Sequence, residues 1–265
     1  MADLFDKQAK EYSMTRPTYP DELYEFITSK TPNHDLVWDV GTGSGQAAVR
    51  LSEIYKKVIA TDTSSQQLAF AIKNQNIRYQ QTSTNMSKSE LERDVAKQET
   101  VDLITVAQAL HWFDLTTFYQ HVTWVLRKPH GVLAVWCYTT PEVDDNVDAI
   151  FQLLYKESAP YWDPARKLID DKYESIHFPF QPVEGMDHTG PFRFVTKRLM
   201  DLDMYFTYIR SWSAYQTARS KNVELLREEL VDEFKRAWGG SGIIRKEVRY
   251  PIYLMMGRVG DEVPK

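Results

Sequence analysis

The fold is decided by the stretch Val37-Trp38-Asp39-Val40-Gly41-Thr42-Gly43-Ser44-Gly45, in which an apolar segment runs into three alternating glycines. Glycine at every second position lets the backbone turn sharply and approach a ligand without an intervening Cβ. The usual dinucleotide fingerprint spaces its glycines as G-x-G-x-x-G and directs a helix N-terminus at a pyrophosphate. Here the third glycine comes one position early, and Asp39 places a carboxylate just before the turn. Such a carboxylate repels a phosphate and attracts a cation.

A second acid follows the next apolar segment. Asp62 ends this segment, at the place where a doubly wound fold presents an acid to ribose hydroxyls. Two acids around a glycine turn suit a ligand that carries a ribose and a positive charge but no phosphate, and S-adenosylmethionine has these properties. The alternative is a strand-to-helix turn with two incidental acids.

Between residues 36 and 138 short apolar runs alternate with longer amphipathic ones, a pattern typical of βαβ units and a parallel sheet. The apolar runs predict strands over 36–40, 57–61, 77–80, 101–107 and 131–138. The amphipathic runs predict helices over 46–55, 65–73, 88–97 and 115–126, on both faces of the sheet. Because open α/β sheets bind ligands beyond the carboxyl ends of their strands, we expect functional residues just after strands.

The second half of the chain is rich in Pro, Asp and aromatic residues from 139 to about 194. This stretch is too long for a structureless loop and predicts an inserted cap with a helix over 147–158. Helices over 204–218 and 222–237 follow, and an apolar strand over 248–259 closes the sheet. We therefore expect a lid segment at 1–30, a ligand-binding Rossmann-like core at 31–138, a cap and acceptor-binding region at 139–245, and a closing strand with the C-terminus at 246–265.

The composition is that of an ordinary globular enzyme. The chain has 265 residues, 32 basic and 37 acidic side chains and a net charge of -5, and this acidic balance disfavours a nucleic-acid partner. Its 7 Trp, 15 Tyr and 12 Phe supply enough apolar surface to exclude global disorder. No stretch approaches the about 20 apolar residues of a membrane helix, and the single Cys137 fits a reducing compartment. We expect a cytoplasmic protein, monomeric or homodimeric, with no membrane partner.

Residues 36–138 resemble the class I S-adenosylmethionine-dependent methyltransferases, whose first motif has the pattern D-x-G-x-G-x-G found at residues 39–45. The segment 101–113 (VDLITVAQALHWF) resembles the family's fourth strand and its exit, and the segment 125–135 (VLRKPHGVLAV) resembles the fifth-strand motif. The resemblance implies an α/β fold with a doubly wound, Rossmann-like, mostly parallel seven-stranded sheet and an inserted helical cap. It also implies that S-adenosyl-L-methionine is the cofactor.

Further segments are similar to a small-molecule subgroup that includes trans-aconitate methyltransferases and plant embryo-abundant-like methyltransferases. These segments are Tyr12 with the run at 16–20 (RPTYP), the run at 111–113 (HWF) and the run at 211–215 (SWSAY). The aconitate enzymes commonly carry Cys and Pro in the glycine turn, where this chain has Thr42 and Ser44. The resemblance therefore leaves the methyl acceptor open.

The residues that we expect to bind the cofactor lie on the glycine turn, the strand exits and the N-terminal segment: Tyr12, Tyr19, Asp39, Gly41, Gly43, Gly45, Asp62, Asn85 and Gln108. Asn85 follows the third predicted strand, where its polar side chain suits the adenine. The fourth-strand exit lacks the Asn/Asp-Pro-Pro-aromatic tetrad of the nucleobase and glutamine amino methyltransferases, which favours a small-molecule acceptor. The six histidines show no metal-ligand spacing, so we expect no metal.

Methyl transfer from a sulfonium is an in-line displacement, so alignment and exclusion of water can supply most of the catalysis. An ionised carboxylate acceptor needs no general base, whereas a phenol or amine does, and His111 is then the candidate base. His111 can equally serve only to orient the acceptor or the loop. The substrate-binding residues that we expect are Arg16, Trp112, Trp212 and Tyr215. Core packing is the alternative for each aromatic, and a surface position is the alternative for Arg16.

Three functions stay open from the residues alone. The first is a methyltransferase that acts on a carboxylate or other oxygen of a small molecule, with nitrogen or carbon acceptors as variants. The second is a nicotinamide oxidoreductase, which the early third glycine and Asp39 disfavour. The third is a non-catalytic binding protein that keeps the fold. For the enzyme, we expect residues 1–20 and 139–218 to close over the site, because water must be kept from the sulfonium.

Overall fold

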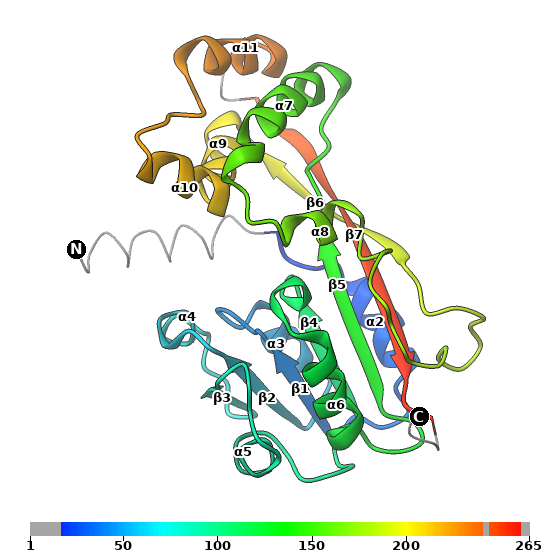
Figure 1. The fold of residues 1–265 in the computed structure, drawn as a ribbon. Coiled ribbons are helices and arrows are strands. Elements are labelled where there is room, and N and C mark those ends of the chain that lie inside the picture. The colour runs from blue at the N-terminus through cyan, green and yellow to red at the C-terminus, as the bar shows by residue number, and fades with distance from the viewer. Residues whose placement is uncertain (1–16, 241–243, 261–265) are drawn as a thin grey trace. The chain divides into compact units, whose positions relative to one another are not determined.

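The computed structural model of the chain describes residues 17–240 and 244–260 (Figure 1). These residues divide into two units. The sheet unit comprises Tyr19–Tyr138, Leu168–Phe194 and the described residues from Ile252 onward, and the helical unit comprises Pro17, Thr18, Thr139–Lys167 and the described residues of Val195–Pro251. The predicted lid, core, cap and closing-strand ranges stay predictions.

A seven-stranded sheet has the order β3-β2-β1-β4-β5-β7-β6 (Figure 1). Its strands are β1 Leu36–Val40, β2 Lys57–Asp62, β3 Ile77–Gln81, β4 Leu103–Ala107, β5 Val132–Tyr138, β6 Phe192–Met200 and β7 Lys246–Arg258. Strands β3, β2, β1, β4 and β5 pair in parallel, and β7 pairs antiparallel to β5. The predicted doubly wound, mostly parallel, seven-stranded sheet is confirmed.

Helices cover both faces of the sheet within the sheet unit. They are α2 Asp21–Ser29, α3 Gln46–Leu51, α4 Ser65–Ala69, α5 Lys88–Asp94, the short 3-10 helix η1 Leu110–Trp112, and α6 Leu115–Val125. Tyr24 of α2 packs edge to face against Trp136 of β5, whereas Phe118 of α6 belongs to the hydrophobic cluster that contains Val135. Because successive side chains of a strand point to opposite faces, α2 and α6 lie on opposite sides of β5.

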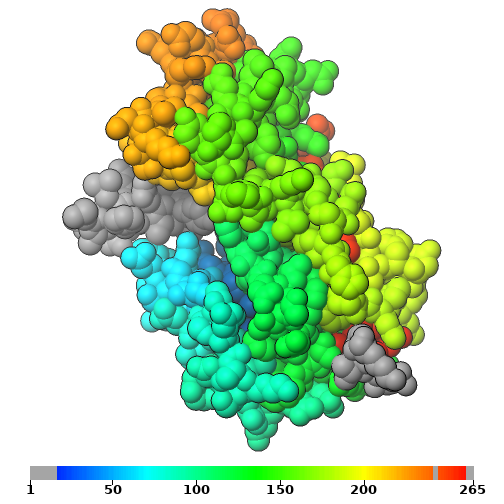
Figure 2. All heavy atoms as spheres, in the orientation of Figure 1, coloured from blue at the N-terminus to red at the C-terminus, as the bar shows by residue number. Residues whose placement is uncertain are grey.

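The segment at 168–194 begins within α8 (Arg166–Asp170), belongs to the sheet unit and covers the α6 side. Tyr119 of α6 packs edge to face against Phe178 and Phe180, with ring centroids 6.3 and 5.3 Å apart. In Figure 2 this yellow-green segment lies beside the green α6. The hydrophobic cluster of the sheet unit therefore includes residues from a part of the chain far beyond the parallel strands.

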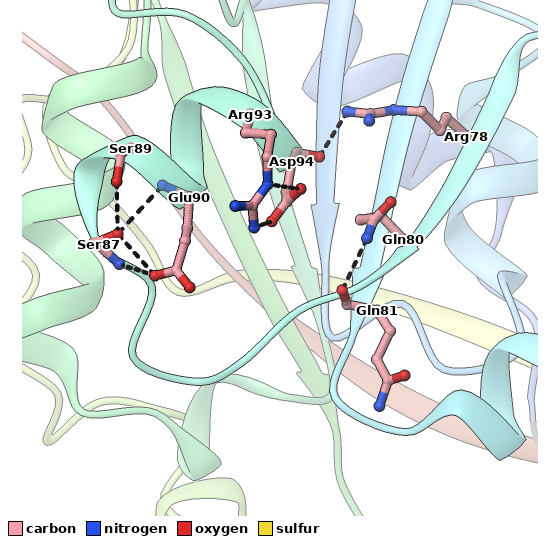
Figure 3. A network of polar contacts seen from close by, with 8 residues as sticks. All are labelled: Arg78, Gln80, Gln81, Ser87, Ser89, Glu90, Arg93 and Asp94. Atoms are coloured by element: carbon pink, nitrogen blue, oxygen red, sulfur yellow. Dashed lines mark hydrogen bonds and ion pairs between the residues drawn. The ribbon is translucent and has the colours of Figure 1, made fainter.

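Capping and backbone bonds hold α5 beside β3 (Figure 3). Ser87 accepts a hydrogen bond from the Glu90 backbone N–H, and the Glu90 carboxylate accepts one from the Ser87 backbone N–H, which forms a capping box. Arg78 of β3 donates to the carbonyl oxygen of Asp94, 2.6 Å away, at the other end of α5. The capping box thus fixes the start of α5 at the end of the loop over residues 82–86, and the Arg78 bond holds the other end of α5 beside β3.

The helical unit has an aromatic core. Its helices are α7 Asp145–Ser158, the 3-10 helix η2 Ala159–Tyr161, α9 Leu202–Arg210, α10 Ser213–Ser220 and α11 Glu228–Trp238. The Trp212 ring packs 5.5 Å from Phe151 and 5.6 Å from Trp162, measured between centroids. No helix within residues 17–240 and 244–260 combines the length and the apolar character needed to cross a membrane.

The sequence pattern does not predict β6, which lies at the edge of the sheet order. Phe192–Met200 interleaves exposed charged side chains such as Arg193 and Lys197 with buried or half-buried ones, and it follows Pro191. Edge strands pair on one side only and commonly carry charge. This strand therefore lacks the continuous apolar run by which the parallel strands are recognised.

Two predicted helices of the second half are wrong in their extent. The single helix predicted over 204–218 is divided into α9 and α10, because Trp212 adopts an extended conformation with φ -67° and ψ 142°. The helix predicted over 222–237 begins only at Glu228. The residues of its expected first turns form a loop instead. In this loop the Leu226 backbone N–H donates to the Glu224 carboxylate, 2.8 Å away.

Candidate functional site

The glycine turn lies between β1 and α3, and its geometry requires glycine. Gly41, Gly43 and Gly45 have φ values of +66°, +58° and +83°, in the left-handed region that side chains disfavour. A Cβ on Gly45 would lie 2.3 Å from the Tyr79 hydroxyl oxygen, and a Cβ on Gly41 would lie 2.6 Å from the Ala109 Cβ. The turn is therefore in close contact with β3 on one side and with the β4 exit on the other.

Asp39 is a buried carboxylate at the carboxyl end of β1, with 1% of its surface exposed. Its two oxygens accept hydrogen bonds from the Thr42 hydroxyl at 2.5 Å and the Thr105 hydroxyl at 2.6 Å. Burial raises the pKa of Asp39 to about 6, the two threonine bonds oppose that rise, and the Asp62 charge adds to it. The protein alone therefore does not fully compensate the negative charge of Asp39.

The influence of Asp39 extends to two phenols. Burial and, to a smaller extent, the nearby Asp39 carboxylate raise the pKa of Tyr79 to about 12. Burial first and Asp39 second also raise the pKa of Tyr24 well above its ordinary value. Both phenols therefore stay protonated and neutral, and a cationic ligand group would find only the carboxylates as opposite charges among these side chains.

Asp62, at the end of β2, ties the glycine turn to the next loop. Its carboxylate accepts hydrogen bonds from the backbone N–H groups of Gly43 and Ser64, both at 2.8 Å. Each carboxylate oxygen can accept more than one hydrogen bond. These bonds fix the orientation of the Asp62 carboxylate while leaving it acceptor capacity for two hydroxyl groups of a ligand.

Gln108 follows β4 in an unusual conformation. Its φ is +57°, its backbone N–H donates to the Trp136 carbonyl oxygen at 2.9 Å, and its side-chain amide N–H donates to the Tyr138 carbonyl oxygen at 3.1 Å. Its side-chain oxygen is buried without a hydrogen-bond partner among the described residues. A buried acceptor of this kind is costly unless a ligand donates to it.

His111 lies on η1, a few residues beyond Gln108. Its Nδ1 is 3.1 Å from the Tyr173 hydroxyl oxygen, and its ring centroid is 4.8 Å from that of Trp112. Trp112 is 56% exposed, which is unusual for so large an apolar side chain. Since Ala109 abuts Gly41, the loop that carries His111 and Trp112 is anchored against the glycine turn.

The other predicted site residues lie in three different places. Tyr19 packs edge to face on Trp136 with ring centroids 5.2 Å apart, and Asn85 is exposed in the loop after β3. Trp212 and Tyr215 are buried in the helical unit, where Tyr215 donates a hydrogen bond to Glu224. Tyr12 and Arg16 lie outside the described residues. The sheet unit brings together the carboxylates, the glycines, Gln108 and the β4 exit. The binding role of each predicted site residue, these included, stays a prediction.

Sequence reasoning missed three residues that organise this region. Thr42 and Thr105 bind Asp39, and Tyr173 binds His111. Thr105 could have been found, because it is a polar residue in an apolar strand and is the direct neighbour of Asp39 in the β1–β4 register. No comparable signal marks Tyr173. Among the described residues no three His, Cys, Asp or Glu side chains gather as metal ligands.

Comparison with known proteins agrees with this geometry. Residues 38–135 match the family model of a methyltransferase domain. A protein of Dictyostelium discoideum named as a methyltransferase is 35% identical, over 97% of this chain and 95% of its own length. A Saccharomyces cerevisiae protein named as an S-adenosylmethionine-dependent methyltransferase is 27% identical over 78% of this chain and 79% of its own length.

A solved structure leads to the same assignment. It is described as a type II methyltransferase from Anaeromyxobacter dehalogenans, shares 28% identity and superposes with a TM-score of 0.79, covering 93% of this chain and 99% of that one. With the full-length relative and the matching domain, it identifies the cofactor of this fold as S-adenosylmethionine. The chain therefore belongs to the class I S-adenosylmethionine-dependent methyltransferases.

Proposed function

We propose that the protein methylates an oxygen atom of a small-molecule acceptor, and that this oxygen belongs to a carboxylate. The observation that carries the proposal is the composition of the β4 exit. His111 is the one ionisable side chain of residues 107–113, and this loop lies against the glycine turn. An ionised carboxylate needs no general base. Methylation of nitrogen or carbon is the alternative, and it requires His111 to remove a proton.

The residues present suit the cofactor. Asp39, with its raised pKa and buried charge, complements the positive charge of the ligand, and the buried side-chain oxygen of Gln108 suits its ammonium group. The oriented Asp62 carboxylate suits the ribose hydroxyls. Tyr19, which packs on Trp136 of β5, and Asn85, in the loop after β3, stay candidates for further contacts with the cofactor. When bound, S-adenosylmethionine supplies an electrophilic methyl group on a sulfonium sulfur.

In this proposal the chain contributes alignment rather than covalent chemistry. The β4 exit holds Trp112 and His111 in one rigid short helix, η1, so that the indole bounds the acceptor and the imidazole hydrogen-bonds to its oxygen. Holding two reactants in line can supply much of the rate enhancement of a displacement. A small-molecule acceptor, a cytoplasmic location and the absence of nucleic-acid, membrane and metal partners stay predictions.

Loss of the Asp62 carboxylate should weaken cofactor binding. Removal of a charge-assisted hydrogen bond costs about 1.5–3 kcal/mol, so Asp62→Ala is expected to raise the Kd for S-adenosylmethionine by about 10- to 150-fold in titration calorimetry. Glu53→Ala is the matched control, because Glu53 is an exposed acid of the same unit that pairs only with Arg50 among its described ion pairs. An unchanged Kd in a folded Asp62→Ala variant would refute the ribose assignment.

Substitution of His111 separates the acceptor classes. With an ionised carboxylate acceptor His111 donates one hydrogen bond, so His111→Gln should lower kcat by only about 10-fold and leave a flat rate profile between about pH 6 and 9. With a phenol or amine, loss of a general base should cost about 10²–10⁴-fold. His130→Gln, at an exposed histidine before β5, is the control. Full activity of both His111→Gln and His111→Ala would remove His111 from the site.

A further inference from the structure

Tyr173 is held in an unfavourable backbone conformation with its side chain fully buried. Tyr173 and the preceding Lys172 have φ values of +64° and +61°, and neither is glycine, so both conformations require support from the surroundings. The Tyr173 backbone N–H donates to the Leu168 carbonyl oxygen at 2.8 Å, and the Lys172 backbone N–H donates to that of Ile169 at 2.9 Å. These bonds form a tight turn directly after α8.

The turn directs the Tyr173 side chain into the hydrophobic cluster beneath the β4 exit. The side chain is 0% exposed and belongs to the same cluster as Val106 and Leu110. Its hydroxyl reaches Nδ1 of His111, 3.1 Å away, across 62 residues of sequence. A buried phenol needs a polar partner for its hydroxyl, and the imidazole proposed to touch the acceptor is such a partner for Tyr173.

A hydrogen bond at one ring nitrogen determines the chemistry of the other. A neutral imidazole carries one N–H donor and one acceptor nitrogen, and the partner of one nitrogen sets which of the two is protonated. If the phenol donates to Nδ1, the proton of His111 is on Nε2. His111 is then a hydrogen-bond donor at Nε2 and has no lone pair there to act as a base.

We propose that Tyr173 is a positioning residue that donates to Nδ1 of His111 and so fixes the Nε2–H tautomer. This inference rests on the proposed function and narrows it, because a histidine held as a donor at Nε2 favours an acceptor that presents an anionic oxygen. A phenol or amine, which must lose a proton, gains nothing from such a histidine. Tyr173 thereby contributes to the choice of acceptor class without touching the acceptor.

The tautomer is measurable without any substrate. In the full-length protein labelled with ¹⁵N-histidine, at a pH where the imidazole is neutral, the ring nitrogen shifts distinguish a protonated from an unprotonated nitrogen. The His111 signals are identified by their loss in His111→Gln. We expect an unprotonated, hydrogen-bonded Nδ1 and a protonated Nε2 in the wild type, and a mixture of tautomers in Tyr173→Phe. A wild-type Nδ1–H tautomer, or an unchanged spectrum in folded Tyr173→Phe, would overturn the proposal.

Tyr119→Phe is the matched control, because the Tyr119 hydroxyl is also buried against this cluster but has no hydrogen-bond partner among the described residues. It should leave the His111 shifts unchanged. Tyr173→Phe should lower kcat about three- to tenfold with no change in the KM for S-adenosylmethionine. If Tyr173→Phe fails to fold, the wild-type spectrum still tests the proposal, because an Nδ1–H tautomer of His111 would contradict it. An Nε2–H tautomer that is lost in Tyr173→Phe, combined with full activity of His111→Gln, would refute the proposed role of His111 in the reaction and leave only the tautomer assignment standing.

Discussion

At about pH 7.5 the Asp39→Asn variant is expected to be more stable than the wild type and to bind S-adenosylmethionine at least about a hundredfold more weakly. Burial raises the pKa of Asp39 from 3.8 to about 6, so the fold favours the protonated form. The charged form therefore costs stability above about pH 6, and this cost disappears as the pH falls towards 3.8. A difference of about two between the folded and unfolded pKa values corresponds to about 3 kcal/mol.

An asparagine removes that cost, because one threonine hydroxyl can still donate to its side-chain oxygen while the other rotates to accept a hydrogen bond from its NH2 group. Urea unfolding should thus show a gain of about 1–3 kcal/mol near pH 7.5 and little gain below about pH 4. Loss of a buried charge that faces a cation costs about 3–5 kcal/mol of binding. Affinity of the wild type should also fall below about pH 6, as Asp39 becomes protonated, and this dependence should be absent from Asp39→Asn.

Asp35→Asn is the control, since Asp35 directly precedes β1 but is half exposed and pairs with Lys56. It should alter neither the affinity for S-adenosylmethionine nor its dependence on pH. If Asp39→Asn destabilises the fold near pH 7.5, or binds S-adenosylmethionine as tightly as the wild type, then the buried charge is not kept for the cofactor.

Gly45→Ala is expected to lower the free energy of unfolding by about 2–5 kcal/mol. The left-handed conformation at φ +83° costs an alanine about 1–2 kcal/mol, and relief of the 2.3 Å collision with Tyr79 costs about 1–3 kcal/mol more. Displacement of the turn should weaken cofactor binding as well. Chemical denaturation measures the first effect and calorimetry the second.

Gly43→Ala separates the two contributions. Gly43 has a similar φ of +58°, but the nearest atom to its Cβ position is the Gln67 side-chain oxygen at 3.9 Å. Its replacement should cost only the conformational part, about 1–2 kcal/mol. Equal losses for the two variants would show that contact with Tyr79 does not restrict the turn.

The parallel half of the sheet could be predicted because each strand carries its own signal. Buried parallel strands are continuous apolar runs, as in Val132–Tyr138 of β5, which is buried throughout. Strand β6 is an edge strand with exposed basic side chains at Arg193 and Lys197, and its pairing is decided by the rest of the fold. The break between α9 and α10 likewise depends on the aromatic core that receives Trp212, and this core is assembled from distant segments.

The candidate site likewise contains residues that a local pattern predicts and residues that depend on distant contacts. Asp39, Asp62 and the glycines were predictable because they are spaced along one βαβ unit whose geometry is general. Thr105 and Tyr173 act through contacts with Asp39 and His111 that span 66 and 62 residues. Such contacts depend on strand register and on the turn after α8, neither of which a local pattern specifies. The sequence therefore predicts where the functional side chains lie, but it does not predict the residues that hydrogen-bond to them and fix their orientation.

The most direct test of the account identifies the methylated product. The full-length protein is incubated with S-adenosylmethionine carrying a labelled methyl group and with fractionated small-molecule metabolites, and the labelled product is treated with mild base. We expect label in a small molecule, release of that label as methanol from a methyl ester, and no transfer by Asp39→Asn. Label that resists base, as on nitrogen or carbon, or label found only in protein or nucleic acid, would contradict the account.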